Sequence, residues 1–292
     1  MNSIAIDDPT AAPKTPSQLF EAYRFRARKR FGQHFLTDPS ILDEIVTIAD
    51  IRSADPVIEI GPGCGTLTLT LVQRGAVVHA VEIDRDAVAF LRQQLEPHYP
   101  VTVQEASALD LDWGQVLQSS AVPWKVVANL PYNISTKLLF LLFEQADQIE
   151  EMTLMFQREV ADRIVARAGE ADFGALSLMS RLYADAHLAM TLPPQAFVPP
   201  PKVHSAVVQF RLIPGTRIVD KELRELFCRL VDGAFKARRK TLANGLKALG
   251  IDKAEVERAL EELDLNPRIR AEKLSFDEFV RLSEKLQTAS GD

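Results

Sequence analysis

The sequence predicts an α/β fold in which a parallel sheet is flanked by helices, followed by a smaller all-helical C-terminal domain. From residue 57 onward, short apolar runs rich in β-branched residues alternate with helical stretches. Beyond residue 215, apolar residues recur at helical spacing instead, as in Leu223, Leu226, Phe227 and Leu230. A chain of 292 residues is long enough for both domains.

The strand candidates are short apolar runs bounded by turn residues. They span residues 57–60, 77–83, 101–103, 126–128 and 152–156. Helical stretches such as 87–95 and 135–143 separate them, which indicates βαβ units. Ser205–Leu212 is expected to close the sheet as an antiparallel end strand. Four amphipathic helices are expected after Pro214-Gly215.

These patterns divide the chain into three parts. Residues 1–23 are rich in Pro and Ala without sustained periodicity, and we expect a flexible leader. Residues 24–214 are expected to form the sheet domain, and residues 215–292 the helical domain.

The composition excludes several protein classes. It is 47% hydrophobic and 25% charged, and the longest apolar run, residues 138–143, is too short to span a bilayer. The first residues do not resemble a secretory signal, so we expect a cytoplasmic protein. With two cysteines, no CxxC pair and five scattered histidines, we expect neither a disulfide framework nor a metal site.

The net charge of −6 does not suggest a nucleic-acid partner, but the basic residues are clustered. One cluster contains Arg24, Arg26, Arg28, Lys29 and Arg30, and the other contains Lys236, Arg238, Arg239 and Lys240. Local positive charge of this kind can contact phosphates, so Arg28, Lys29, Arg30 and the second cluster are candidates for nucleic-acid binding. Alternatively, each cluster is a solvated helix face.

Residues 57–65 indicate a cofactor site, because a buried strand runs into the turn Gly61-Pro62-Gly63-Cys64-Gly65 before a helix. Gly61 and Gly63 would let a ligand approach the backbone, and Glu59 would brace the turn. Glu82 ends the next strand, where a carboxylate commonly holds ribose hydroxyls. Together they predict an adenosine-containing cofactor.

Two alternatives to this assignment remain. The NAD fingerprint G-x-G-x-x-G requires a glycine where this chain has Thr66, so the spacing favours a methyltransferase. The turn could also be a simple connection between strand and helix.

A second candidate site, the catalytic segment (residues 129–132), follows the fourth strand. The exocyclic amine of adenine is a poor nucleophile unless acceptors hold both of its hydrogens. Asn129 can supply a side-chain oxygen and Leu130 a main-chain oxygen, while Pro131 has no N–H and directs the preceding carbonyl. Tyr132 can stack on the base. Alternatively, residues 129–132 form an ordinary turn without a catalytic role.

The chain resembles the small-subunit ribosomal RNA adenine dimethyltransferases (the KsgA type) from about residue 24 to its end. The matching stretches are residues 28–36, 61–65, 129–132, 156–164, 200–205, 235–242 and 270–275. The C-terminal matches distinguish it from the ribosomal methyltransferases that confer antibiotic resistance.

The resemblance implies a Rossmann-like class I sheet that binds S-adenosylmethionine. It also implies transfer of two methyl groups to N6 of each of two adjacent adenosines, in a hairpin loop near the 3′ end of small-subunit RNA. The implied partner is the immature small subunit, with a role in its biogenesis, and the protein is expected to act as a monomer.

The resemblance further implies roles for individual residues. His34 and Leu36 would contact the cofactor alongside Gly61, Glu82 and Asn129. Tyr132 and Phe156 would enclose the target base.

This sequence departs from the family pattern at two positions. Ser107 stands where an aspartate commonly holds the adenine amino group, which predicts weaker cofactor binding. His34 stands where asparagine is common, and a neutral imidazole can make a similar contact. Two other functions remain open: an RNA-binding assembly factor without catalysis, and a methyltransferase for another amine, such as a protein glutamine or a different nucleic-acid site.

Overall fold

The structure, a computed structural model, describes residues 12–13, 15–24 and 34–289. The chain divides into two compact units, which are described separately below. The first unit is Met1–Arg158 with His187–Pro214, and the second is Glu159–Ala186 with Gly215–Asp292.

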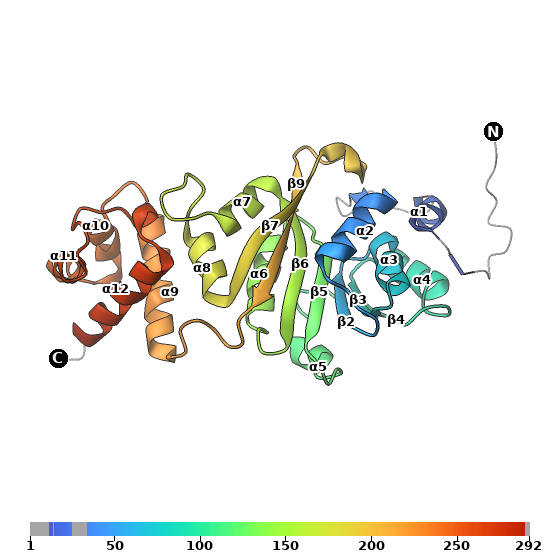
Figure 1. The fold of residues 1–292 in the computed structure, drawn as a ribbon, viewed down its shortest axis with the longest axis horizontal. Coiled ribbons are helices and arrows are strands. Elements are labelled where there is room, and N and C mark those ends of the chain that lie inside the picture. Colours follow the sequence, from blue (N-terminus) through green and yellow to red (C-terminus); the bar gives the residue numbers. More distant parts are fainter. Residues whose placement is uncertain (1–11, 14, 25–33, 290–292) are drawn as a thin grey trace. The chain divides into compact units, whose positions relative to one another are not determined.

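The first unit is built on a seven-stranded sheet with the order β4-β3-β2-β5-β6-β9-β7 (Figure 1). The strands are β2 (Pro56–Ile60), β3 (Val77–Glu82), β4 (Val101–Glu105), β5 (Trp124–Asn129), β6 (Ile149–Gln157), β7 (Ala184–Leu192) and β9 (Ser205–Leu212). Strands β2 to β6 pair in parallel, and β9 is antiparallel to β6. The predicted α/β fold with a parallel sheet is confirmed. The strand order changes direction between β2 and β5, where such sheets bind ligands.

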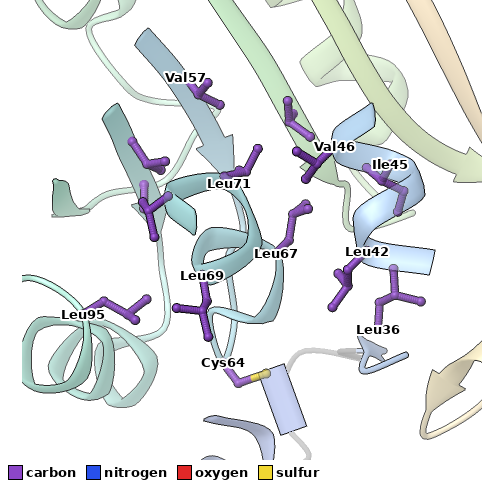
Figure 2. Packing of buried hydrophobic residues seen from close by; sticks show 14 of the residues in the cluster. Leu36, Leu42, Ile45, Val46, Val57, Cys64, Leu67, Leu69, Leu71 and Leu95 are labelled. Carbon is purple, nitrogen blue, oxygen red and sulfur yellow. The ribbon is translucent and has the colours of Figure 1, made fainter. Parts of the chain in front are cut away.

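Helices pack on both faces of this sheet. They are α2 (Pro39–Ile48), α3 (Thr66–Gln73), α4 (Arg85–Gln94), α5 (Trp113–Leu117) and α6 (Ser135–Phe143). Figure 2 shows Leu67 of α3 and Val46 of α2 in the core that α2, α3 and α4 share with the sheet. On β9, Val207 belongs to this core, whereas Phe210 contacts Phe143 of α6 with ring centroids 5.9 Å apart. Because strand residues alternate between faces, α6 covers the face opposite α2.

Helix α1 (Pro16–Arg24) covers residues 16–23 of the segment that was expected to be a flexible leader, whereas residues 1–11 and 14 lie outside the described residues. Its Leu19 and Tyr23 are 1% and 0% exposed and belong to the core of the first unit. Pro13, just before the helix, accepts a hydrogen bond of 2.7 Å from the hydroxyl of Tyr99. Proline is compatible with the first position of a helix, so the Pro-rich composition of this segment does not exclude α1.

Two short strands and one long strand complete the sheets. β1 (Phe35–Leu36) pairs antiparallel with β8 (Phe197–Val198), and η1 (Pro194–Ala196) precedes β8. β7 was not predicted, and it occupies the sheet edge that Ser205–Leu212 was expected to form. Most of its residues are half-buried or exposed, so its sequence lacks the continuous apolar run of the central strands.

The second unit is mainly helical in its described part, which also contains the first three residues of β7. Its elements are α7 (Arg158–Val165), α8 (Ala175–Tyr183), α9 (Lys221–Lys236), α10 (Leu242–Leu246), η2 (Lys247–Leu249), α11 (Lys253–Glu262), η3 (Ala271–Lys273) and α12 (Phe276–Ala289). Phe227, Leu260 and Phe279 are buried in one core. Helix α9 begins after Asp220, whose carboxylate accepts the N–H of Leu223 at 2.7 Å, as a helix N-cap does.

The compact units differ from the expected domains in one segment. Glu159–Ala186 clusters with the C-terminal helices, because Leu178, Leu182 and Phe173 belong to their core. Across the residues that the structure describes, no helix is long and apolar enough to cross a membrane.

Candidate functional site

The glycine loop (residues 61–65) joins β2 to α3 at the carboxyl edge of the sheet. The φ angles of Gly61, Gly63 and Gly65 are 69°, 57° and 83°, in the left-handed region that favours glycine. Space is restricted as well, since a Cβ on Gly63 would lie 2.9 Å from Cε1 of Phe35. The loop therefore requires glycine both for its backbone angles and for its close packing.

Glu82, the last residue of β3, is buried, and its carboxylate accepts three backbone hydrogen bonds. Oε2 accepts from Gly63 at 3.0 Å, and Oε1 accepts from Ile83 and Asp84 at 2.8 Å each. Burial raises the pKa of Glu82, although the N–H donors favour its charged form. The carboxylate joins the glycine loop to the end of the neighbouring strand.

Asn129 ends β5, beside the strand that leads into the glycine loop. Its Nδ2 donates a hydrogen bond of 3.1 Å to the backbone carbonyl of His34. Because the N–H₂ group is used in this way, the side chain presents Oδ1 as an acceptor. Pro131 packs on the glycine loop, with its Cδ 3.8 Å from where a Cβ on Gly61 would lie. The predicted catalytic segment and cofactor loop are therefore in contact.

Tyr132 and His34 lie nearly parallel, with ring centroids 6.1 Å apart. The Tyr132 hydroxyl lies 2.6 Å from Oγ of Ser205, and burial raises the pKa of Tyr132. Nδ1 of His34 lies 2.6 Å from the carbonyl oxygen of Pro199. A carbonyl can only accept, so Nδ1 bears the proton and both rings are fixed by hydrogen bonds.

One cavity of about 280 Å³ in the first unit brings most of the predicted residues together. The predicted residues that line it are His34, Leu36, Gly61, Gly63, Glu82, Ser107, Asn129, Leu130, Pro131 and Tyr132. Its size is close to the ~300 Å³ lower end of small-molecule sites. The glycine backbone, the Glu82 carboxylate and this volume fit an adenosine-containing cofactor.

Sequence reasoning missed several residues of the cavity wall. Ile83 lines the cavity and is 55% exposed, so its apolar side chain is available to a ligand. Leu109 and Asn133 also line it. Ile83 follows Glu82 directly, and an apolar residue just beyond the predicted acid was the available clue.

Two predicted residues, Glu59 and Phe156, are not on the cavity wall. Phe156 is 0% exposed and packs edge-on against Phe210, with ring centroids 6.3 Å apart. Thr153 and Met155 of the same strand do line the cavity. Side chains alternate along a strand, so Phe156 lies on the other face, and the structure does not bring it to the site.

Glu59 lies on β2 beneath the glycine loop and is 2% exposed. Its Oε2 has no hydrogen-bond partner among the described residues. Burial raises the pKa of Glu59 to about 8. Its position before the loop fits a bracing role, with no side-chain contact to the cavity.

The predicted basic clusters differ in what the structure describes. Arg28, Lys29 and Arg30 lie outside the described residues. In the second unit, Nζ of Lys236 is 2.6 Å from Oδ2 of Asp232, and Nε of Arg238 is 3.0 Å from Oε2 of Glu272.

Arg239 and Lys240 are exposed, and the structure records no ion pair of either with another described residue. Within the described ranges, no group of three or more His, Cys, Asp or Glu residues could hold a metal ion.

Replacing Gly63 with alanine is expected to destabilise the first unit and to weaken cofactor binding. The strain of positive φ costs about 1–2 kcal/mol, and the clash with Phe35 adds to it. Urea denaturation gives the free energy of unfolding. Gly250→Ala is the control, because Gly250 has φ of 80° with nothing within 4 Å of an added Cβ. An equal decrease in the free energy of unfolding in both variants would contradict the close packing of Phe35 against Gly63.

Glu59→Gln is expected to flatten the dependence of stability on pH. Between pH 4.5 and about 8 the folded chain retains a proton on Glu59 that the unfolded chain has released. Stability therefore falls as pH rises through this window, by at most about 1.4 kcal/mol per pH unit. Glutamine does not titrate, so the stability of the variant relative to wild type should be greatest at pH 8 and smallest near pH 5.

Thermal unfolding without added ligand, recorded from pH 5 to 8.5, measures this difference. Glu44→Gln, at an exposed position, is the control and should track wild type. An unchanged pH slope in Glu59→Gln would show that Glu59 is charged in the folded protein.

Comparison with known proteins gives one consistent family. The sequence pattern of the family described as ribosomal RNA adenine dimethylase matches residues 24–288. The ribosomal RNA small subunit methyltransferase A of Syntrophotalea carbinolica is 41% identical over 262 residues, covering 90% of this chain and 97% of the relative. The protein of the same name from Methylococcus capsulatus is 43% identical, covering 89% and 97%.

Solved structures agree with the sequence matches. A dimethyladenosine transferase from Plasmodium falciparum has a TM-score of 0.75 and 26% identity, covering 88% of this chain and 98% of that chain. The 23S rRNA methyltransferase ErmE has a TM-score of 0.67 and 25% identity, covering 87% and 99%. The resemblance inferred from the motifs is confirmed, and the chain belongs to the ribosomal RNA adenine dimethylase family.

Proposed function

We propose that this protein dimethylates N6 of two adjacent adenosines in a hairpin loop near the 3′ end of small-subunit ribosomal RNA, using S-adenosylmethionine. It would act as a cytoplasmic monomer on the immature small subunit, with a role in small-subunit biogenesis. The observation that carries this proposal is Asn129, whose N–H₂ group is held by His34 beside the cavity of the glycine loop. The names of the curated relatives support the small subunit as the substrate.

At the cofactor end, the chain supplies both polar and apolar contacts. The cofactor, when bound, provides a methyl group activated by a positively charged sulfur. Glu82 would accept hydrogen bonds from the ribose hydroxyls, and Ile83 would cover one face of the adenine. Ser107 would contact the adenine amino group, and Gly61 and Gly63 would let the cofactor lie against the backbone.

At the base end, the catalytic segment would hold the amine in a reactive geometry. Oδ1 of Asn129 and the carbonyl of Leu130 would accept the two N6 hydrogens, which localises the nitrogen lone pair. Tyr132 would stack on the base, a contact worth about 1–3 kcal/mol. The cofactor would supply the methyl group: as the N–C bond forms, the bond from that carbon to sulfur would break and leave a neutral thioether, and the N6 proton would pass to water.

The basic cluster at residues 236–240 of the second unit is proposed to contact phosphates of the RNA. Arg239 and Lys240 are exposed and would contact the RNA directly. Lys236 and Arg238 would first have to share or leave their carboxylate partners, Asp232 and Glu272. We also propose contacts from Arg28, Lys29 and Arg30, by family resemblance.

Asn129→Ala is expected to lower the rate of methyl transfer by about 100-fold or more, since it removes an acceptor that acts on the reacting amine. Labelled S-adenosylmethionine is incubated with immature small subunits and either protein, and mass spectrometry maps the modified nucleotide. Unchanged thermal unfolding of the variant excludes loss of the fold.

The same experiment separates the remaining functions. A wild-type protein that binds subunits without transferring label would be an assembly factor without catalysis. Label on a protein, or on a nucleotide outside the proposed hairpin, would identify another amine as the substrate. Full activity of Asn129→Ala would show that the Asn129 side chain is not needed for methyl transfer.

Ser107→Asp is expected to tighten S-adenosylmethionine binding by about threefold to tenfold, because a carboxylate accepts a stronger hydrogen bond from the adenine amino group than a hydroxyl does. Isothermal titration calorimetry measures the Kd. Ser107→Ala serves as the matched variant and should bind no tighter than wild type. Equal or weaker binding by Ser107→Asp would indicate that the adenine does not bind beside residue 107.

A further inference from the structure

Tyr23 of α1 forms a bridge between the cavity wall and α4. Its ring is 0% exposed, and its centroid lies 5.7 Å from that of Phe35 and 5.1 Å from that of Phe90. Phe35 lines the cavity, whereas Phe90 is buried on α4. Tyr23 does not line the cavity itself, but its ring contacts Phe35, which does.

Phe35 depends on α1 for its position. It belongs to β1, which has two residues and pairs only with the equally short β8 in its sheet. A ribbon of this size has little stability of its own. Phe20 and Tyr23 of α1 supply the aromatic contacts, since the Phe20 and Phe35 ring centroids lie 6.0 Å apart. Two residues of α1 therefore contact the ring.

The Phe35 ring also lies against the glycine loop. A Cβ on Gly63 would lie only 2.9 Å from Cε1 of Phe35, and the N–H of Gly63 donates to Glu82. A displaced Phe35 ring would leave Gly63 without its packing partner. The contacts thus connect Tyr23, through Phe35 and Gly63, to the carboxylate of Glu82, which is proposed to hold the ribose hydroxyls.

The ring of Tyr23, and not its hydroxyl, makes these contacts. The hydroxyl is buried without a hydrogen-bond partner among the described residues. Burial and the nearby carboxyl groups of Asp84 and Glu82 raise the pKa of Tyr23, so the phenol remains neutral. A second contact holds the chain before α1, where Tyr99 donates to the Pro13 carbonyl.

We propose that Tyr23 is a positioning residue for cofactor binding, and that α1 is a strap that holds Phe35 against the glycine loop. The matched family pattern begins at residue 24, so nearly all of α1 precedes it. The proposal rests on the proposed function, because it takes S-adenosylmethionine as the ligand of the cavity.

The test compares three variants of the full chain with wild type by calorimetry with S-adenosylmethionine and by methyl-transfer kinetics. Tyr23→Leu should raise the Kd and the KM for the cofactor about tenfold, with kcat at saturating cofactor within about twofold, because preorganisation of the site is lost. Tyr23→Phe should retain the wild-type Kd, since it keeps the ring. Trp124→Leu is the control, because Trp124 is buried at the start of β5, whose other end bears Asn129.

Hydrogen exchange of the Gly63 amide in the unliganded chain provides a readout that does not need the cofactor. Exchange should be faster in Tyr23→Leu than in Trp124→Leu, because only the first variant disturbs Phe35. If Tyr23→Leu does not fold, Phe20→Leu replaces it, since Phe20 is only partly buried and contacts the same ring.

The proposal is overturned if the Tyr23 variant, or its Phe20 replacement, keeps the wild-type Kd and Gly63 exchange rate. It is also overturned if Trp124→Leu shows the same changes, which would indicate general loss of stability. A wild-type protein that binds no S-adenosylmethionine would contradict the proposed function instead, and the exchange of Gly63 would still decide the role of α1.

Discussion

The three hydrogen bonds accepted by the Glu82 carboxylate are the interaction on which the candidate site depends. They join the glycine loop after β2 to the end of β3 and to the N–H of Asp84, at the start of α4. These segments meet where the strand order changes direction, so one buried acid shapes the loop and remains on the cavity wall. A neutral side chain of the same length would accept fewer N–H groups, and the loop would lose its support.

Strand periodicity decides which side chains reach the cavity. On β6, Thr153 and Met155 face it, while Phe156 lies in the aromatic core with Phe210. The same alternation separates Val207 from Phe210 on β9. Family resemblance assigned a role to Phe156, but the backbone geometry of the strand assigns its side chain to the opposite face in this conformation.

Most of the sheet could be predicted because its central strands are continuous apolar runs, and the site could be predicted because Glu82 and Asn129 end two of them. Helix α1 and strand β7 were not predicted, for different reasons. Leu19 and Tyr23 of α1 have helical spacing, but the helix is short, and the residues that bury the Tyr23 ring, Phe35 and Phe90, lie elsewhere in the sequence. β7 has apolar residues at alternate positions from Ala184 to Leu192, but it lacks the continuous apolar run by which the central strands were identified.

The ion pairs of Lys236 with Asp232 and of Arg238 with Glu272 affect how the second unit would respond to ionic strength. Binding of a basic side chain to a nucleic acid is driven largely by the release of condensed counterions from phosphates. A cation that already faces a carboxylate contributes fully only after that carboxylate has been displaced. The cluster should therefore show a shallower salt dependence than its four positive charges suggest, and a larger share of its affinity would have to come from shape and hydrogen bonding.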